Sequence, residues 1–330
     1  MKKEKLYSID TQLYKVTGVE KVMLDIHQAV KDEYEAKIVG TILYDQIRKE
    51  HNISRDEYIK LGNPFIFYKS IVIVHERKLL LLFWLLNLIL FQKIKIVYIH
   101  HSLFYDHIKS TILPKTIIAI ADKGIENLTE VFKVPINHIH KIYNCVKDQS
   151  CFQPKKINRD EITLLLPGRI NYLKQQTQIV KQLKGKIDRR IRIQFAGDGP
   201  DLEELKAVCD GDNQFEVLGF RSDVHQLIHD CNYVFLYSIS EGLPITLIES
   251  VMLGTPILCS NVGGTPEICH HGKNGWVLND WEELIEKINS LPDVTQEEYK
   301  RMCNESRRIY EENFTFETFK KNYLDLLKKI

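Results

Sequence analysis

The segment Ser240–Leu253, which reads SEGLPITLIESVML, has the composition of a ligand-binding turn followed by a helix. Pro244 suits the first helical position because its φ angle is fixed, and Gly254 is placed to end the helix. Glu241 and Gly242 then occupy the turn at the helix N-terminus, where free N–H groups and the helix dipole favour an anion such as phosphate. The carboxylate of Glu241 suits a sugar attached to that phosphate, because it accepts hydrogen bonds from hydroxyls.

Glu249 lies inside the same predicted helix, in a largely apolar stretch. A carboxylate in such a place needs hydrogen-bond partners, and the two hydroxyls of a ribose would supply them. The alternative is that Glu241 is an ordinary residue of a first helical turn and Glu249 an ordinary solvated helix residue.

A second candidate segment, Leu166–Lys174 (LPGRINYLK), follows a predicted strand. Gly168 allows a tight turn, Arg169 can bind two phosphate oxygens at once, and Lys174 adds a point charge. Together the two cations would hold a diphosphate and stabilise the negative charge that grows on it as it leaves. The alternative is two ordinary surface cations.

Three further loops share this pattern of glycine, tight backbone and helix start. They are Gly197–Pro200 (GDGP), Gly219–Asp223 (GFRSD) and Gly263–Glu267 (GGTPE). Each is weak evidence alone, because a plain strand-to-helix turn has the same composition.

Alternating strands and helices position these loops, which predicts an α/β fold with parallel sheets. The strands predicted from short apolar runs are Ala36–Gly40, Ile71–His75, Ile94–His100, Thr116–Ala121, Ile162–Leu166, Ile191–Ala196, Phe215–Leu218, Tyr233–Tyr237 and Pro256–Cys259. The predicted helices are Gly18–Val30, Arg77–Phe91, Lys123–Phe132, Gln175–Leu183, Asp201–Val208, Val224–Ile228, Pro244–Leu253, Trp281–Ile288 and a final helix from about Thr315. Ligands of open parallel sheets bind at the carboxyl ends of the strands, where the loops above lie.

A chain of 330 residues exceeds the usual size of one core, which predicts two domains. We place them at residues 1–150 and 151–310, with a polar linker near Asp148–Asp160 and a C-terminal helix, 311–330, packing back toward the first domain. The hydrophobic fraction of 44% fits a globular protein, and a formal charge of +1 provides no general field for nucleic acid or a membrane.

The run Leu79–Phe91 (LLLLFWLLNLILF) is 13 residues long, whereas a membrane-spanning helix needs about 20. Apolar residues all round the helix predict that it is buried on most faces inside a domain. The alternative is a helix that partly rests on a membrane, where a lipid-linked acceptor would wait.

Seven cysteines without a CxxC pair indicate neither a zinc site nor a disulfide framework, and they suit a reducing cytoplasm. The N-terminal MKKEKLYSID has no apolar segment after its lysines, so it does not resemble a signal peptide. We therefore expect a cytoplasmic protein, with the inner face of the membrane as the alternative location.

The order and spacing of these motifs resemble the retaining family-four glycosyltransferases (glycosyl transferases group 1), which have the GT-B fold. The resemblance covers about residues 160–280, where Glu241 and Glu249 are followed by SNVGGTPEI and NGWVL. The first half is less similar, since Thr17 and Cys145 stand where glycine is common and Ala121 where serine is frequent.

The resemblance implies two Rossmann-like domains facing across a donor cleft, with no metal and no cofactor. It implies that Arg169 and Lys174 hold the diphosphate and that Glu249 holds the ribose. The backbone near Arg221 would then contact the base. The loop of Glu241, Gly242 and Leu243 would hold the sugar, and Gly18 would let the first loop approach the donor phosphates.

Similar enzymes carry a histidine near the sugar, and His100-His101 follows the strand Ile94–Ile99. We expect His100 to be catalytic together with Glu241, because His100 comes first after the strand. His101 remains open as the residue that faces the site, and His75, after another strand, is the second choice.

These features predict transfer of a hexose-type sugar from a nucleoside-diphosphate sugar, such as a UDP-sugar, to an acceptor hydroxyl. By family analogy the acceptor is a bacterial surface polysaccharide or its lipid-linked precursor, with peripheral membrane contact and no nucleic acid as partner. The alternatives are a nucleotide-sugar epimerase of the same fold and an inactive nucleotide-sugar-binding protein.

Overall fold

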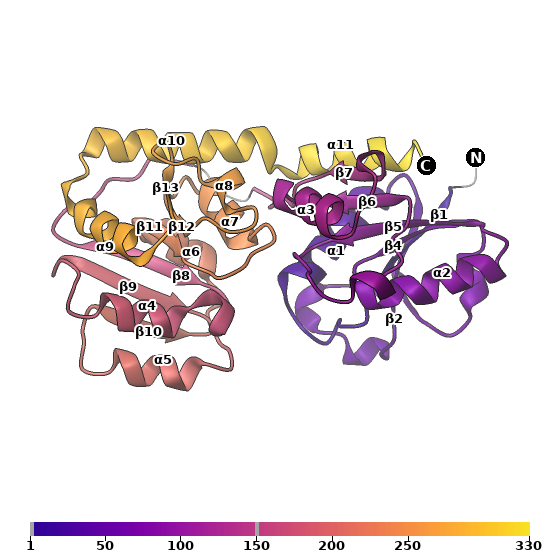
Figure 1. The fold of residues 1–330 in the computed structure, drawn as a ribbon, viewed down its shortest axis with the longest axis horizontal. Helices are drawn as coiled ribbons and strands as arrows, with labels where there is room; N and C mark the ends of the chain where they lie inside the picture. Colours follow the sequence, from indigo (N-terminus) through magenta and orange to yellow (C-terminus); the bar gives the residue numbers. More distant parts are fainter. Residues whose placement is uncertain (1–2, 149–151) are drawn as a thin grey trace. The chain divides into compact units, whose positions relative to one another are not determined.

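The computed structural model describes residues 3–148 and 152–330, so residues 149–151 of the predicted linker lie outside the described residues (Figure 1). The chain divides into two compact units. Unit 1 comprises Met1–Cys145 and Phe316–Ile330, and unit 2 comprises Val146–Thr315. The sequence-based boundaries, at residues 150 and 310, differ from this division by a few residues. The C-terminal segment Phe316–Ile330 belongs to unit 1.

Unit 1 contains a parallel sheet that has seven strands among the described residues, in the order β3-β2-β1-β4-β5-β6-β7. The strands are β1 (Lys5–Ile9), β2 (Glu35–Gly40), β3 (Tyr58–Lys60), β4 (Ser70–Val74), β5 (Ile94–His100), β6 (Thr116–Ala119) and β7 (Ile139–Lys141). Every residue of the central β4, SIVIV, is buried. This is typical of a parallel strand that is covered on both faces.

The α-helices of unit 1 are α1 (Gly18–Val30), α2 (Leu80–Ile89), α3 (Asp122–Glu126) and α11 (Phe316–Leu327). Shorter helical turns are η1 (Tyr44–Gln46), η2 (Lys49–His51), η3 (Pro64–Phe67), η4 (Arg77–Leu79), η5 (Ile108–Ser110), η6 (Asn127–Val131) and η7 (Ile136–His138). Helix α11 packs against α1, and Lys320 Nζ lies 3.1 Å from Asp32 Oδ2 just beyond the end of α1.

Unit 2 contains a parallel sheet that has six strands among the described residues, in the order β10-β9-β8-β11-β12-β13. The strands are β8 (Ile162–Pro167), β9 (Ile191–Ala196), β10 (Phe215–Gly219), β11 (Tyr233–Leu236), β12 (Ile257–Ser260) and β13 (Gly275–Leu278). Leu164 and Leu166 of β8 join the core formed with several helices. Leu165 points to the opposite face and is also fully buried, so helices or loops cover both faces.

The α-helices of unit 2 are α4 (Gln176–Leu183), α5 (Leu202–Cys209), α6 (Val224–Asp230), α7 (Ile245–Met252), α8 (Thr265–Ile268), α9 (Trp281–Ser290) and α10 (Gln296–Asn313). Helical turns lie at η8 (Tyr172–Lys174) and η9 (Leu291–Asp293). Helix α10 packs against α7. The α/β fold predicted from alternating apolar runs is confirmed, and each unit has the sheet topology of a Rossmann-like domain.

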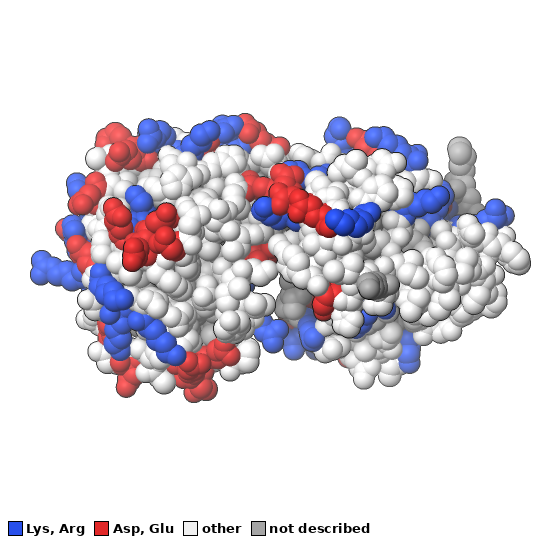
Figure 2. Space-filling model, viewed as in Figure 1, with Lys and Arg blue, Asp and Glu red and all other residues white. Residues whose placement is uncertain are grey.

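Helix α2 contradicts the prediction that the run Leu79–Phe91 is buried on most faces. Only a narrow stripe, which includes Leu80 and Phe83, is buried, and the remaining apolar side chains of the helix are exposed or partly exposed. Figure 2 shows that the surface over α2 carries few charged residues. Within the described parts of the chain, no helix combines the length and hydrophobicity needed to cross a bilayer.

Candidate functional site

The sheet of unit 2 changes direction at β8. The chain proceeds outward from β8 to β9 and β10, and then returns to β11 on the other side of β8. The loops that follow β8 and β11 therefore leave the sheet side by side at its carboxyl edge. In open parallel sheets this switch point is where ligands bind.

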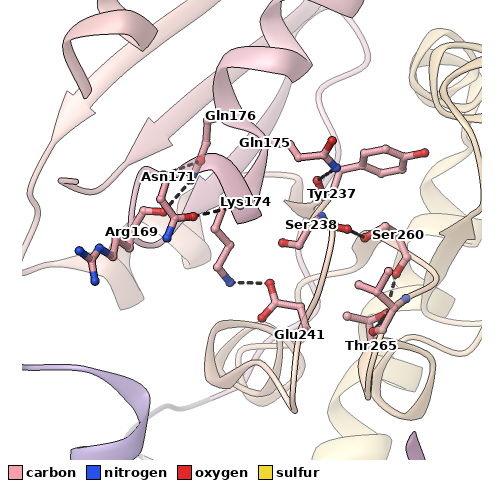
Figure 3. Close-up of polar contacts among 11 residues, drawn as sticks. Arg169, Asn171, Lys174, Gln175, Gln176, Tyr237, Ser238, Glu241, Ser260 and Thr265 are labelled. Carbon is pink, nitrogen blue, oxygen red and sulfur yellow. Dashed lines mark hydrogen bonds and ion pairs between the residues drawn. The ribbon is translucent and has the colours of Figure 1, made fainter. Parts of the chain in front are cut away.

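The two loops at the switch point of unit 2 are joined by an ion pair. Lys174 Nζ lies 2.6 Å from Glu241 Oε1, and the two side chains are 21% and 9% exposed (Figure 3). The structure thus brings together two residues predicted to contact adjacent parts of one ligand, the phosphate and the sugar.

Hydrogen bonds fix the loop on which Lys174 lies. Asn171 Oδ1 accepts a bond from the Lys174 N–H at 3.1 Å and so caps the turn η8. The Ile239 N–H donates to the Leu173 carbonyl at 2.8 Å, and Gln175 Nε2 donates to the Tyr237 carbonyl at 3.1 Å. These bonds tie the loop after β8 directly to the loop after β11.

Arg169 lies on the same loop as Lys174 and is exposed. Its carbonyl accepts a hydrogen bond from Gln176 Nε2 at 3.0 Å, which holds the backbone. In Figure 3 its guanidinium extends away from the Lys174–Glu241 pair. The predicted grip of Arg169 and Lys174 on one diphosphate stays a prediction.

The glycine motifs that were weak evidence in the sequence pack the neighbouring loops against these two. A Cβ on Gly197 would lie 1.9 Å from the Gly168 carbonyl oxygen. A Cβ on Gly263, whose φ is +54°, would lie 1.9 Å from the Glu241 carbonyl oxygen. Larger residues at these positions would push apart the loops that carry Arg169 and Glu241.

Helix α7 begins one residue later than predicted. Pro244 is its N-cap residue, with φ −71° and ψ 117°, and the helix runs from Ile245 to Met252. Leu243, in the preceding turn, is buried, and the adjacent Gly242 accepts a hydrogen bond at its carbonyl from the Gly264 N–H at 2.7 Å. The turn before α7 is therefore anchored rather than loose.

Glu249 on α7 pairs with His225 on α6, since the distance between Oε1 and Nε2 is 3.3 Å. The Glu249 side chain is only 15% exposed and therefore needs a hydrogen-bond partner. In the free protein the imidazole of His225 is that partner. Arg221 follows β10, and its Nε donates to Asp223 Oδ1 at 2.7 Å. The predicted contacts of Glu249 with ribose and of the backbone near Arg221 with the base stay predictions.

Two hydroxyl groups that sequence reasoning did not single out, those of Ser260 and Thr265, hold the loops after β11 and β12. Ser260 Oγ accepts from the Ser238 N–H at 3.0 Å and lies 2.8 Å from the Ser238 carbonyl. Thr265 Oγ1 donates to the Ser260 carbonyl at 2.6 Å. Ser260 is the last residue of β12 and Ser238 follows β11 by two residues, positions that could have identified them.

In unit 1 the predicted glycine-rich loop forms the start of α1. Thr17 is the N-cap residue, and Gly18 is the first helical residue. Glu20 Oε2 accepts from the Thr17 N–H at 2.9 Å, which completes a capping box. The residue that replaces the family's usual glycine thus stabilises the helix start, and the role of Gly18 toward a donor stays a prediction.

Unit 1 has its own switch point, between β1 and β4. Glu76, after β4, accepts hydrogen bonds from the Thr11 N–H at 2.6 Å and from Thr11 Oγ1 at 2.9 Å, after β1. Asp10, at the end of β1, is fully buried, and its Oδ1 accepts from the Gln12 N–H at 2.5 Å. Burial, together with the nearby carboxylates of Glu20 and Glu76, raises the pKa of Asp10 to about 7.

His100 is the last residue of β5, and only 2% of it is exposed. Its Nε2 lies 3.0 Å from Asn127 Oδ1, its ring packs edge-on against Phe104 and Phe132, and burial lowers its pKa to about 4. A catalytic role for His100 stays a prediction, although the ring is enclosed by these groups.

The next residue, His101, is partly exposed. Its Nε2 lies 3.1 Å from Nδ1 of His75, and the two rings stack with centroids 5.3 Å apart. Burial lowers the pKa of His75 to about 3, so the imidazole of His75 is uncharged at neutral pH. The structure thus joins the two histidines that were the second choices, His75 directly after β4 and His101 directly after β5.

The cysteines at 209, 231, 259, 269 and 303 are free and buried, and Cys145 is buried. Among the described residues, no group of three or more His, Cys, Asp or Glu side chains is arranged to hold a metal ion.

Comparison with known proteins identifies similar sequences and folds. Residues 147–309 match the family model of glycosyl transferases group 1. The 2-deoxystreptamine N-acetyl-D-glucosaminyltransferase of Niallia circulans is 25% identical over 227 residues, which cover 63% of this chain and 56% of that protein. Spore coat protein SA of Bacillus subtilis is 37% identical over 101 residues, which cover 29% and 26% of the two chains. The chain therefore matches only about half or less of the length of these relatives.

Solved structures resemble the fold over nearly its whole length. Anabaena HepE in complex with UDP has a TM-score of 0.84 at 17% identity and covers 99% of this chain and 100% of its own. The lipopolysaccharide outer core galactosyltransferase WaaB has a TM-score of 0.83 at 18% identity, with the same coverage. At these identities the likeness establishes the fold.

The raised pKa of Asp10 predicts a pH-dependent loss of stability. The folded protein holds this proton up to about pH 7, whereas the unfolded chain releases it near pH 4, so the folded state binds more protons in between. The free energy of unfolding should therefore fall as pH rises from about 4 through 7, by more than about 1 kcal/mol relative to Asp10→Asn. Urea unfolding of the wild type and of Asp10→Asn across this pH range measures the difference in the free energy of unfolding. Parallel curves would contradict the assignment, and Asp56→Asn, an exposed aspartate of the same unit, is the control.

The Lys174–Glu241 pair predicts different stabilities for two variants of one loop. Lys174→Ala leaves the carboxylate of Glu241 mostly buried without its cation, which should lower the free energy of unfolding by roughly 1–3 kcal/mol. Arg169→Ala removes an exposed cation and should change it by less than about 0.5 kcal/mol. Adding Glu241→Gln to Lys174→Ala should restore part of the loss. Equal effects of the two single variants in urea unfolding would refute this prediction.

Proposed function

Because this chain belongs to the glycosyl transferases group 1 family and has the GT-B fold, we propose that it is a glycosyltransferase. In the proposed reaction a hexose-type sugar moves from a nucleoside diphosphate to an acceptor hydroxyl. The observation that carries the proposal is the Lys174–Glu241 pair at the switch point of unit 2. It places a cation suited to a diphosphate beside a carboxylate suited to sugar hydroxyls.

The proposed donor is a UDP-sugar. Anabaena HepE, which shares the fold, was crystallised with UDP and with UDP-glucose. In our proposal Arg169 and Lys174 hold the diphosphate, and the backbone near Arg221 contacts the base. Glu249 exchanges His225 for the ribose hydroxyls, which is a modest change because His225 is 44% exposed.

The proposed mechanism relies on stabilising the leaving group. As the bond between the sugar and the diphosphate breaks, negative charge grows on the phosphate oxygens and positive charge on the sugar ring. Lys174, Arg169 and the N-terminus of α7 stabilise the negative charge on the phosphate oxygens. Glu241 stabilises the positive charge on the sugar ring. The acceptor then attacks from the face that the diphosphate leaves, so the configuration is retained, and the departing phosphate takes the acceptor proton. No metal enters this proposal, because cationic side chains act in its place.

The proposed acceptor is a bacterial surface polysaccharide or its lipid-linked precursor, and we propose that the protein works in the cytoplasm. Relatives support this class. One of them is the putative colanic acid biosynthesis glycosyltransferase WcaL of Salmonella typhimurium, which is 23% identical over 152 residues. Those residues cover 42% of this chain.

A donor panel tests the proposed function. We expect UDP to raise the thermal unfolding midpoint in EDTA and UDP-sugars to be hydrolysed slowly or transferred, because a ligand that binds only the folded state stabilises it. GDP and ADP, with their sugars, are the comparison. Stabilisation that needs manganese would overturn the metal-independent donor site. Conversion of the donor sugar without an acceptor would indicate an epimerase, and binding without turnover an inactive binding protein.

Replacing Glu249 and replacing Glu241 should change different kinetic constants of the proposed reaction. Glu249→Ala removes a contact to the ribose, which does not change during reaction, so the donor KM should rise about tenfold or more and UDP binding should weaken. Glu241→Ala should mainly lower kcat, because its contacts strengthen as charge develops on the sugar. Steady-state kinetics with varied donor and UDP titrations measure both, and Glu286→Ala on α9 is an exposed control. An exchange of the two behaviours would reverse the assignments.

A further inference from the structure

Helix α2 presents a wide apolar face to solvent. Its inward stripe consists of Leu80 and Phe83, followed by Leu90 just after the helix. The outward residues and their exposures are Leu81 47%, Leu82 51%, Trp84 40%, Leu85 46%, Leu88 45%, Ile89 66% and Phe91 81%. A contiguous set of this size marks an interaction surface, because soluble proteins rarely leave large apolar patches open.

The neighbouring turn η3 adds aromatic side chains to this surface. Phe67 of η3 packs edge-on against Phe83 of α2, with ring centroids 5.2 Å apart, so the two segments are in contact. On the same turn Phe65 is 65% exposed, and the following Tyr68 is 42% exposed. We call the outward residues of α2, together with Phe65, Tyr68 and Phe91, the α2 face.

The backbone after α2 holds Phe91 outward. Phe91 and Gln92 have φ values of +55° and +56°, a left-handed region that is unfavourable for a bulky L-residue. Asn87 stabilises this turn, since its carbonyl accepts from the Gln92 N–H at 2.7 Å and its Oδ1 from the Ile94 N–H at 2.8 Å. The protein thus keeps an unfavourable backbone conformation that exposes an aromatic ring.

Lys69 and Lys93, beside the α2 face, form no ion pair among the described residues. Other nearby cations are paired: Arg77 Nη2 lies 2.7 Å from Asp106 Oδ1, and Lys95 Nζ lies 2.8 Å from Glu4 Oε1. Glu76 is 7% exposed at its side chain and already pairs with Lys78 at 2.6 Å. Lys69 follows Tyr68 directly, Lys93 follows the turn of Phe91, and both are exposed.

We propose that the α2 face docks on the surface of a bilayer that contains anionic lipids. The apolar side chains would enter the boundary between headgroups and acyl chains, and Lys69 and Lys93 would meet the lipid phosphates. A helix of 10 residues is only about 15 Å long, so it would lie in the interface.

A second copy of this chain fits the α2 face less well than a bilayer does. Two copies meeting through this face would bring Lys69 and Lys93 of both copies together, whereas the nearby carboxylates of Glu76 and Asp106 already pair with Lys78 and Arg77. Anionic headgroups supply the missing negative charge. This inference does not depend on the donor chemistry of unit 2.

Sedimentation of the full chain with lipid vesicles tests the proposal. We expect it to bind vesicles of phosphatidylcholine with phosphatidylglycerol, and to bind pure phosphatidylcholine vesicles more weakly. Ile89→Glu should reduce binding at least about tenfold, because it places a charge in the apolar face. The matched control is Ile136→Glu, since Ile136 on η7 is 65% exposed, against 66% for Ile89. Lys69→Glu and Lys93→Glu should weaken binding only to the anionic vesicles, as should added salt.

Several results would overturn the proposal. They are failure of the wild-type protein to bind either vesicle, and equal binding by Ile89→Glu and Ile136→Glu. A dimer in sedimentation velocity that Ile89→Glu dissociates would assign the face to a second copy instead. Stabilisation by UDP, measured on Ile89→Glu, separates this test from that of the proposed function. It also shows that the variant is folded, because docking and donor binding use different residues.

Discussion

Every strand in the described sheets runs parallel to its neighbours, so each strand needs a connection that crosses a face of the sheet and returns to the starting edge. All loops that follow strands therefore meet at the carboxyl edge. At one point in each sheet the connections diverge to opposite sides, at β1 and β4 in unit 1 and at β8 and β11 in unit 2. The apolar strands can be buried on both faces only because the polar residues gather at that edge.

The polar residues at the two edges are arranged differently. In unit 2 the pair across the switch point, Lys174 and Glu241, carries opposite charges and remains partly accessible, so a charged ligand can replace one partner. In unit 1 the bridge from Glu76 to Thr11 is accompanied by the buried Asp10 and the uncharged His75–His101 pair. Burial keeps Asp10 and His75 close to neutral, as the raised pKa of Asp10 and the lowered pKa of His75 show. Burial acts in the same sense on Glu76, but hydrogen bonds from Lys78 and Thr11 outweigh it and lower the pKa of Glu76, which stays negatively charged. An edge of this kind suits neutral hydroxyl groups better than phosphates.

Sequence reasoning succeeded where one physical signal dominates. Helix α1 and strands β5 and β9 have the predicted bounds, because capping residues and continuous apolar runs define them. Strands β1, β3, β7 and β13 were missed, since all four are short and the first three mix polar with apolar residues. Helix α10 was missed because it is polar overall, although its capping box at Thr295 and Glu298 and the spacing of its buried residues are both visible in the sequence.

The candidate site was predictable by residue type but not by contact. That Lys174 meets Glu241 depends on β8 and β11 being neighbours, which is a property of strand order and not of local sequence. The choice between His100 and His101 depends on side-chain direction. His100 shares the buried face of Tyr98 because successive strand residues alternate, and that turns His101 toward His75.

Helix α2 shows a limit of hydrophobicity as a signal. A helix that is apolar on all faces is usually expected to be buried in the protein. The same sequence pattern arises when one face packs on the protein and the other contacts the apolar part of a membrane. The distinguishing information lies outside the helix, in Lys69 and Lys93, the exposed cations before and after it that form no ion pair among the described residues. Helix α2 also begins a few residues after β4, so its first turn lies near the carboxyl edge of unit 1. A bilayer on the α2 face would therefore lie near the edge that carries His75, Glu76 and Asp10, where an acceptor anchored in lipid could reach it.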